Sequence, residues 1–274
     1  MALNITPITN HREREKGNIV YPVYSRRAEG LSIGINLYPD KKNCLFNCVY
    51  CEVFPFANTA SFSLELMKEG LQEAIDSAQK QNIPIKDICF SGNGEPTLSP
   101  SFPDALFLAE NIRAQMTPSS QLVIITNGTG LLQPQVFSLL AETSANPAVN
   151  IWLKIDAGTP QWYQKMNRSS VPFDKLIEKI KELSFCSPVT IQTMLCAIND
   201  DQQPEKDVQA WEDLVCELAK NGNIKKVQVY GKARAAPEDP LASELPAEYL
   251  ENRAKSLQEK FGDGGIGIKV EVYV

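Results

Sequence analysis

The chain contains the stretch Cys44-Leu45-Phe46-Asn47-Cys48-Val49-Tyr50-Cys51, which places three thiols within eight residues. An apolar run rich in β-branched residues, residues 32–37, precedes this stretch. Such a run predicts a buried strand. The stretch is too short to hold further strands or helices between its cysteines. The three thiols are therefore expected in one loop at the carboxyl end of that strand.

The rest of the chain alternates short apolar runs with longer stretches of helical period, which is the pattern of βα units around a parallel sheet. Strands are predicted over residues 32–37, 88–91, 122–126, 149–155, 190–195 and 226–230. Helices are predicted between them, over residues 64–79, 102–115, 134–141, 173–183 and 205–219. Six strands joined by right-handed crossovers predict an α/β fold, a partial (βα)6 TIM-like barrel.

The predicted domain organisation has three parts: a short N-terminal extension over residues 1–30, the core barrel over residues 31–240, and a C-terminal part over residues 241–274. The last part contains a helix at 248–261 and a strand at 267–274, which are expected to pack on the barrel. In barrels of this type, chemistry gathers at the carboxyl ends of the strands. Five motifs follow or close a predicted strand and are expected to converge there: the cysteine loop and residues 92–95, 126–128, 156–158 and 230–231.

The composition narrows the class of protein. The chain has 274 residues, 43% of them hydrophobic, and 27 basic against 33 acidic side chains, a net charge of -6. This balance argues against broad attraction to nucleic acid or to an anionic membrane. No apolar run approaches the roughly 18 residues of a membrane span, and the first ten residues do not form an apolar leader. We expect a cytoplasmic protein that does not enter a membrane.

Three thiolates in one loop are suited to three corners of a single iron–sulfur cluster. Because such clusters usually take four cysteines, three ligands leave one iron open to another ligand. A zinc site with a fourth ligand elsewhere is the alternative. The single histidine, His11, lies 33 residues before Cys44. The other four cysteines are interpreted as small apolar residues of strands and helices: Cys89, Cys186, Cys196 and Cys216.

Two further motifs close predicted strands with glycine and polar residues. Gly92-Asn93-Gly94-Glu95 offers close backbone approach at its glycines and a carboxylate that can accept a hydrogen bond from an ammonium group. Thr126 and Asn127 offer a hydroxyl and an amide to a ribose or a carboxylate. The alternative for both motifs is an ordinary tight or capped turn.

Polar side chains also interrupt the later apolar strands. Lys154 and Asp156 are two residues apart, hence on one face of the predicted strand. A charged pair there is costly unless it meets partners or a polar ligand, and a purely structural pair is the alternative. Gln192 and Asn199 are weaker candidates for the same polar lining.

The spacing CxxxCxxC, with the aromatic Tyr50 before the last cysteine, resembles the signature of the radical SAM superfamily. The resemblance implies a 4Fe-4S cluster on Cys44, Cys48 and Cys51 whose open iron binds S-adenosylmethionine (SAM). The reduced cluster would cleave SAM into methionine and a 5'-deoxyadenosyl radical that abstracts hydrogen from a substrate. SAM would also be contacted by residues of the motifs above: Tyr50, Gly92, Asn93, Gly94, Glu95, Thr126, Asn127, Lys154, Asp156, Gln192 and Asn199.

Over residues 25–240 the chain further resembles the wyosine-synthase-related branch of that superfamily. The similarity is carried by Ser25-Arg26-Arg27, residues 32–36, GNGEPTL, TNG, KIDAGT, Met166-Asn167-Arg168 and residues 232–235. Enzymes of that branch build wyosine in tRNA and carry a second cluster on three further cysteines. No cysteine precedes Cys44 here. The resemblance therefore implies the fold and the SAM chemistry with one cluster, without the wyosine reaction, and the charge does not favour tRNA.

Three functions remain open from the sequence. The first is a radical SAM oxidoreductase or transferase for a small molecule or modified nucleoside, with flavodoxin or ferredoxin as reductant. Six basic side chains could line the mouth of its substrate site: Arg26, Arg27, Lys41, Lys42, Lys232 and Arg234. The alternative is that they form an ordinary solvated surface. The second is an activase that generates a glycyl radical on a partner protein. The third is a non-catalytic iron–sulfur or zinc protein.

Overall fold

The computed structural model describes residues 17–233, 236 and 241–274. The chain divides into two compact units. The first comprises Met1–Cys44, Val53–Thr126 and Asn146–Asn150, and the second comprises Leu45–Glu52, Asn127–Ala145 and Ile151–Val274. Arg234 and His11 lie outside the described residues.

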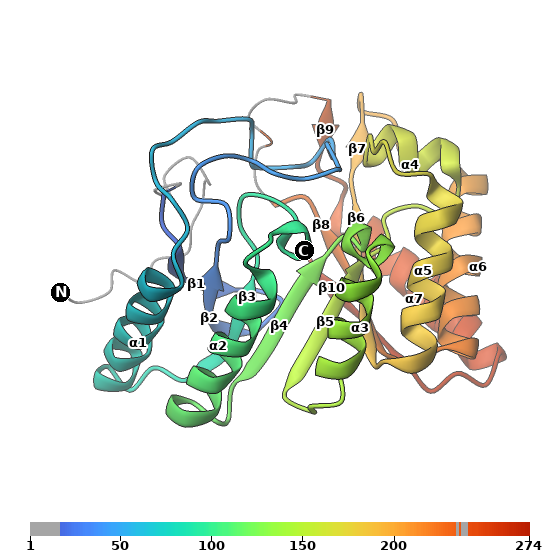
Figure 1. The fold of residues 1–274 in the computed structure, drawn as a ribbon. Helices are drawn as coiled ribbons and strands as arrows, with labels where there is room; N and C mark the ends of the chain where they lie inside the picture. Colours follow the sequence, from blue (N-terminus) through green and yellow to red (C-terminus); the bar gives the residue numbers. More distant parts are fainter. Residues whose placement is uncertain (1–16, 234–235, 237–240) are drawn as a thin grey trace. The chain divides into compact units, whose positions relative to one another are not determined.

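The first unit contains four neighbouring strands in the order β1-β2-β3-β4. Its strands are β1 (Val20–Ser25), β2 (Gly30–Ile35), β3 (Ile85–Phe90) and β4 (Gln121–Thr126). β1 pairs antiparallel with β2, whereas β2, β3 and β4 run parallel. Two helices, α1 (Leu64–Lys80) and α2 (Phe102–Met116), lie side by side on this unit, and the short helix η1 (Pro96–Leu98) precedes α2 (Figure 1).

Helix α1 shows how the sequence builds this unit. The helix begins after Ser63, whose Oγ accepts a hydrogen bond from the N–H of Leu66 at 3.4 Å, as an N-cap does. Its buried side chains recur at helical spacing: Met67, Leu71, Ala74, Ile75 and Ala78. On β3, successive side chains alternate between two faces. Phe90 meets Phe102 of α2 edge to face at 5.5 Å, so Asp87 and Cys89 point to the face away from α2.

The second unit contains parallel strands in the order β5-β6-β8-β10. They are β5 (Val149–Lys154, of which residues 151–154 belong to this unit), β6 (Val189–Leu195), β8 (Ile224–Gly231) and β10 (Lys269–Tyr273). Its helices are η2 (Thr129–Leu132), α3 (Pro134–Thr143), α4 (Pro160–Met166), α5 (Phe173–Cys186), α6 (Glu205–Asn221) and α7 (Ala247–Asp263). A separate antiparallel pair joins β7 (Ala197–Ile198) to β9 (Ala242–Ser243).

All six predicted strands and all five predicted helices are present, with ends that differ by a few residues. The prediction placed no strand at β1, where Pro22 interrupts the apolar pattern. Proline is tolerated there because β1 is an antiparallel edge strand. The prediction also lacked α4 and the β7–β9 pair, which are too short to give a periodic signal. The predicted final strand corresponds to β10, which adds to the sheet beside β8.

Within the described residues, no helix combines the length and the apolar character that a membrane span requires.

Candidate active site

In the first unit, the residue before Cys44 pairs with the glycine-containing segment that follows β3. The N–H of Asn43 donates to the carbonyl oxygen of Asn93 at 3.1 Å, and the N–H of Glu95 donates to the carbonyl oxygen of Asn43 at 2.8 Å. These two bonds form a short parallel bridge between Asn43 and Gly94. The structure thus brings the predicted Gly92–Glu95 segment next to the start of the cysteine stretch.

Glycine is required at two positions of this segment. A Cβ at Gly94 would lie 2.0 Å from the carbonyl oxygen of Asn43, so no side chain fits there. Gly92 has φ 129°, and a Cβ there would lie 2.6 Å from Oδ1 of Asn36. The close backbone approach predicted for these glycines is therefore directed at Asn36 and Asn43, in the chain that leads into the cysteine stretch.

Asn93 is almost fully buried and holds the chain leading to Cys44. Its Nδ2 donates to the carbonyl oxygen of Tyr38 at 2.9 Å, and its N–H donates to Oδ1 of Asn36 at 3.1 Å. The same Oδ1 accepts from the N–H of Tyr38 at 3.2 Å. Asn36 was not predicted as a site residue, although it is the last residue of the stretch 32–36 that carries part of the sequence resemblance.

Glu95 and Thr126 lie next to each other in the first unit, and their contacts with SAM stay predictions. Oε1 of Glu95 accepts from the Thr126 hydroxyl at 2.6 Å and from the hydroxyl and N–H of Thr97 at 2.7 and 3.2 Å. Glu95 is 2% exposed, so these bonds replace the water that the carboxylate loses on burial. Burial also raises the pKa of the neighbouring Tyr38 phenol to about 12, and the charge of Glu95 adds to this rise.

In the second unit, Asp156 accepts hydrogen bonds from three separate elements. Its Oδ2 accepts from the Tyr50 hydroxyl and from Nδ2 of Asn167 at 2.8 Å, and its Oδ1 accepts from the N–H of Met194 on β6 at 2.9 Å. Asp156 is 3% exposed. The carboxylate therefore joins the cysteine stretch, the end of α4 and β6 at one buried point.

The end of α4 also binds the backbone of the cysteine stretch. The N–H groups of Asn47 and Val49 donate to the carbonyl oxygens of Asn167 and Met166 at 2.9 and 3.0 Å. The side chain of Asn167 donates through Nδ2 to Sγ of Cys48 at 3.4 Å. Met166-Asn167-Arg168 was part of the sequence resemblance, but its contact with Cys48 was not predicted, since α4 gives no periodic signal.

Lys154 lies over two aromatic rings. Its Nζ is 4.4 Å from the ring centroid of Tyr50 and 5.7 Å from that of Tyr230, which are cation–π distances. Burial works to lower the pKa of Lys154, but the neighbouring Tyr230 and Asp156 outweigh it and raise that pKa. The amine is therefore protonated at neutral pH. Burial next to Asp156 raises the pKa of Tyr50, so this phenol remains a neutral donor.

The remaining predicted residues of the second unit sit in different settings. Gln192 pairs in register with Lys154 and donates through Nε2 to Oε1 of Gln228 at 2.7 Å, and both amides are fully buried. Asn127 accepts from the hydroxyl and the N–H of Thr129 at 2.7 and 2.9 Å. Asn199 adopts φ 55° in the turn after β7, a conformation that asparagine tolerates. Their contacts with SAM stay predictions.

The basic side chains predicted at a substrate mouth are distributed over several loops. Arg26 lies in the turn between β1 and β2, where its carbonyl oxygen accepts from the N–H of Glu29. Arg27 is half-buried beside it. Burial raises the pKa of Asp87 to about 6, whereas the hydrogen bond from Ser32 and the charge of Arg27 work to lower that pKa. Lys41 lies 3.9 Å from Asp40 at the surface. The substrate role of these residues stays a prediction.

All seven cysteines are free thiols, and Cys44, Cys48 and Cys51 are each half-exposed. Cys44 belongs to the first unit, and Cys48 and Cys51 belong to the second. Across the described ranges, no three side chains of His, Cys, Asp or Glu are already grouped as a metal site. By donor chemistry, three accessible thiols with an amide N–H on one sulfur fit an iron–sulfur cluster.

Comparison with known proteins supports the reading of these motifs. The family model described as the radical SAM superfamily matches residues 39–210, which is more than half of the chain. A UPF0026 protein of Helicobacter pylori is 32% identical over 171 residues, covering 62% of this chain and 51% of the relative. The alignment therefore spans about half the length of that relative.

Solved structures show the fold. SuiB of Streptococcus suis, bound to its precursor peptide SuiA, has a TM-score of 0.65 at 14% identity and covers 86% of this chain and 48% of its own. TYW1 with a lysine-pyruvate adduct has a TM-score of 0.53 at 16% identity and covers 83% of this chain and 73% of its own. These likenesses confirm the predicted α/β fold of the partial-barrel type. The match of the family model over more than half of the chain's length establishes that the chain belongs to the radical SAM superfamily.

Proposed function

We propose that this protein holds a single 4Fe-4S cluster on Cys44, Cys48 and Cys51 and uses it, with SAM, to abstract hydrogen from a small-molecule or modified-nucleoside substrate. Membership of the superfamily implies an iron–sulfur cluster and SAM. The observation that carries the proposal is the CxxxCxxC stretch, with its backbone and one sulfur bound by Asn167.

When bound and reduced, the cluster supplies the electron that cleaves SAM and so generates the 5'-deoxyadenosyl radical. The chain's own residues position the reactants. Asp156 and Asn167 hold the second half of the cysteine stretch through Tyr50 and Cys48. The Gly92–Glu95 segment is proposed to meet the amino group of SAM. Lys154, protonated and half-buried over Tyr50, offers a positive charge to a carboxylate.

One cluster is proposed because the other cysteines are dispersed. Cys89 and Cys196 are buried in strands or just after them, whereas Cys186 and Cys216 lie on α5 and α6. These settings support a structural role for the four residues, and the wyosine reaction is not proposed.

The proposed surroundings follow from the chemistry. A one-electron reductant such as flavodoxin or ferredoxin would reduce the cluster, and we expect it, like this protein, in the cytoplasm. With a net charge of -6, tRNA is not the favoured substrate. The curated relative is matched over half its length only, so the reaction of the whole protein is part of the proposal.

The experiment that tests the proposal is anaerobic. The protein is reconstituted with iron and sulfide, reduced with dithionite and mixed with SAM, and 5'-deoxyadenosine is followed by chromatography. We expect SAM cleavage that depends on the reductant. Iron binding without sulfide, in a tetrahedral thiolate site, would support the zinc-type alternative instead. An intact, reduced cluster that leaves SAM uncleaved would favour the non-catalytic iron–sulfur protein.

The contact of Asn167 with Cys48 leads to a prediction about the cluster. Replacing Asn167 with leucine, which has a similar size but no N–H, is expected to make the midpoint potential more negative. The reason is that an N–H directed at a ligating sulfur stabilises the extra electron of the reduced cluster. The measurement is a redox titration followed by electron paramagnetic resonance.

A matched control is Asn252→Leu on α7, where the asparagine is exposed. It should leave the potential unchanged. Asn167→Gln keeps an amide N–H, so its potential should lie between those of the wild type and Asn167→Leu. If Asn167→Leu assembles a normal cluster with the wild-type potential, the hydrogen bond to Cys48 has no role in tuning it.

A further inference from the structure

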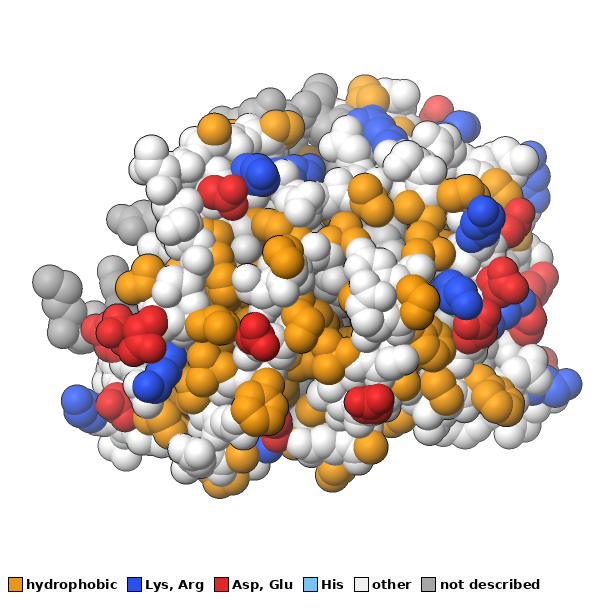
Figure 2. Space-filling view, viewed as in Figure 1, with side chains coloured by type: hydrophobic (Ala, Val, Ile, Leu, Met, Phe, Trp, Pro, Cys, Tyr) orange, Lys and Arg blue, Asp and Glu red, His pale blue; other side chains and the backbone are white. Residues whose placement is uncertain are grey.

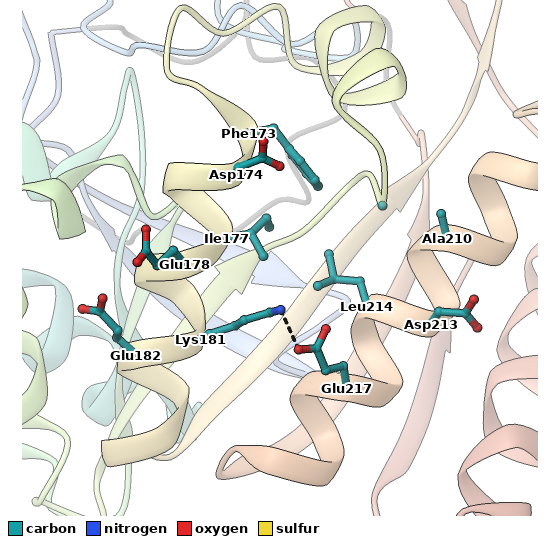
Figure 3. Close-up of a pocket in the computed structure, with 11 residues that line it drawn as sticks. Phe173, Asp174, Ile177, Glu178, Lys181, Glu182, Ala210, Asp213, Leu214 and Glu217 are labelled. Carbon is teal, nitrogen blue, oxygen red and sulfur yellow. Dashed lines mark hydrogen bonds and ion pairs between the residues drawn. The ribbon is translucent and has the colours of Figure 1, made fainter.

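A groove between α5 and α6 of the second unit lies outside the site described above. It has a volume of about 780 Å³. Apolar side chains form its floor: Phe173 and Ile177 from α5, and Ala210 and Leu214 from α6. Figure 3 shows Phe173, Ile177 and Leu214 directed into the space between the two helices. Ile177 and Leu214 are buried, at 8% and 9% exposure, whereas Phe173 and Ala210 are half-exposed.

Carboxylates form both walls of the groove. On α5, Asp174, Glu178 and Glu182 recur every fourth residue, so they form one stripe along the helix. On α6, Asp213 and Glu217 have the same spacing (Figure 3). All five side chains are exposed. Figure 2 shows acidic side chains, with basic ones among them, gathered over α5 and α6 at the right of the view.

Three of the five carboxylates pair with lysines of this chain: Glu182 with Lys179 at 2.6 Å, Asp213 with Lys260 at 3.1 Å, and Glu217 with Lys181. Lys181 is the one basic residue in the lining, and its Nζ pairs across the groove with Glu217 at 2.6 Å. Both side chains of this pair are more than 40% exposed, and such pairs contribute about 0 to 1 kcal/mol. Among the described residues, no ion pair involves Asp174 or Glu178. An incoming cation can therefore pair with the carboxylates of Asp174 and Glu178 at little cost.

We propose that this groove is the docking site for a basic amphipathic segment of a protein partner. The apolar floor matches the apolar face of such a segment, and the two carboxylate stripes match lysine or arginine side chains at its edges. The stripe from Asp174 to Glu182 is about 12 Å long, which corresponds to roughly two helical turns of the partner. The same charges repel nucleic acid and acidic peptides. This inference goes beyond the proposed SAM chemistry and does not depend on it.

The test uses the full chain, reconstituted anaerobically, and a synthetic probe. The probe is a fluorescein-labelled helical peptide of about four turns with leucines on one face and lysines on the other. Binding is followed by fluorescence anisotropy. We expect saturable binding to the wild type and a weakening of about tenfold or more for the double variant Glu178→Lys, Glu182→Lys.

Two controls separate the groove from general charge attraction. The double variant Glu69→Lys, Glu73→Lys makes the same charge change at the same spacing on exposed positions of α1, and it should bind like the wild type. A probe with serine in place of each leucine should bind much more weakly. Absence of saturable binding, an equal loss in the α1 variant, or equal binding of the serine probe would each overturn the proposal.

Discussion

Replacing Cys48 with alanine is expected to reduce 5'-deoxyadenosine formation to the level of cluster-free protein. The three cysteines of the CxxxCxxC stretch are proposed as the only protein ligands of the cluster, and removal of one leaves two irons without a thiolate instead of one. The variant should therefore lose bound iron and sulfide after reconstitution as well as SAM cleavage. Iron and sulfide content, visible absorption and product formation are measured on the same samples.

The matched control is Cys186→Ala. Cys186 is exposed at the end of α5, where its Sγ contacts the carbonyl oxygen of Leu183 and the hydroxyl of Ser187. This variant should keep the full cluster content and the full rate of SAM cleavage. SAM cleavage by Cys48→Ala at the wild-type rate would contradict the ligand assignment, and equal loss in both variants would point to damage that is not specific to the stretch.

The sequence predicted the parts of this protein that depend on local pattern. The six strands and five helices of the predicted barrel follow from apolar periodicity, and all of them are present. The need for glycine at Gly92 and Gly94 was also readable, because a glycine pair after a buried strand indicates close backbone approach. The sequence did not predict that Gly94 contacts Asn43, because that contact joins residues about fifty positions apart.

The sequence could not show how the predicted polar residues are used. Asp156 was predicted to meet SAM, and the structure places the Tyr50, Asn167 and Met194 donors on its two oxygens. Those donors come from three elements, one of which, α4, is only seven residues long and has no periodic signal. Such convergence depends on tertiary packing, which neither spacing nor propensity encodes. The predicted contact of Asp156 with SAM therefore remains to be tested separately from its structural role.

The structural role of Asp156 predicts the second large effect. Replacing Asp156 with alanine should lower the free energy of unfolding by about 3 to 5 kcal/mol, because three buried donors lose their acceptor. Lys154 would also lose a nearby negative charge that keeps it protonated. The measurement is urea unfolding of the protein without cluster, followed by circular dichroism, so that the result does not depend on iron binding.

Two further variants make the Asp156 prediction specific. Asp76→Ala removes an exposed carboxylate from α1 and should change stability by less than about 0.5 kcal/mol. Asp156→Asn keeps one oxygen, which can still accept from the N–H of Met194, but its amide group cannot accept from Tyr50 or Asn167. Its free energy of unfolding should therefore fall between those of the wild type and Asp156→Ala. If Asp156→Ala unfolds at the wild-type urea concentration, the three hydrogen bonds do not hold the cysteine stretch, and the residue is free to serve SAM alone.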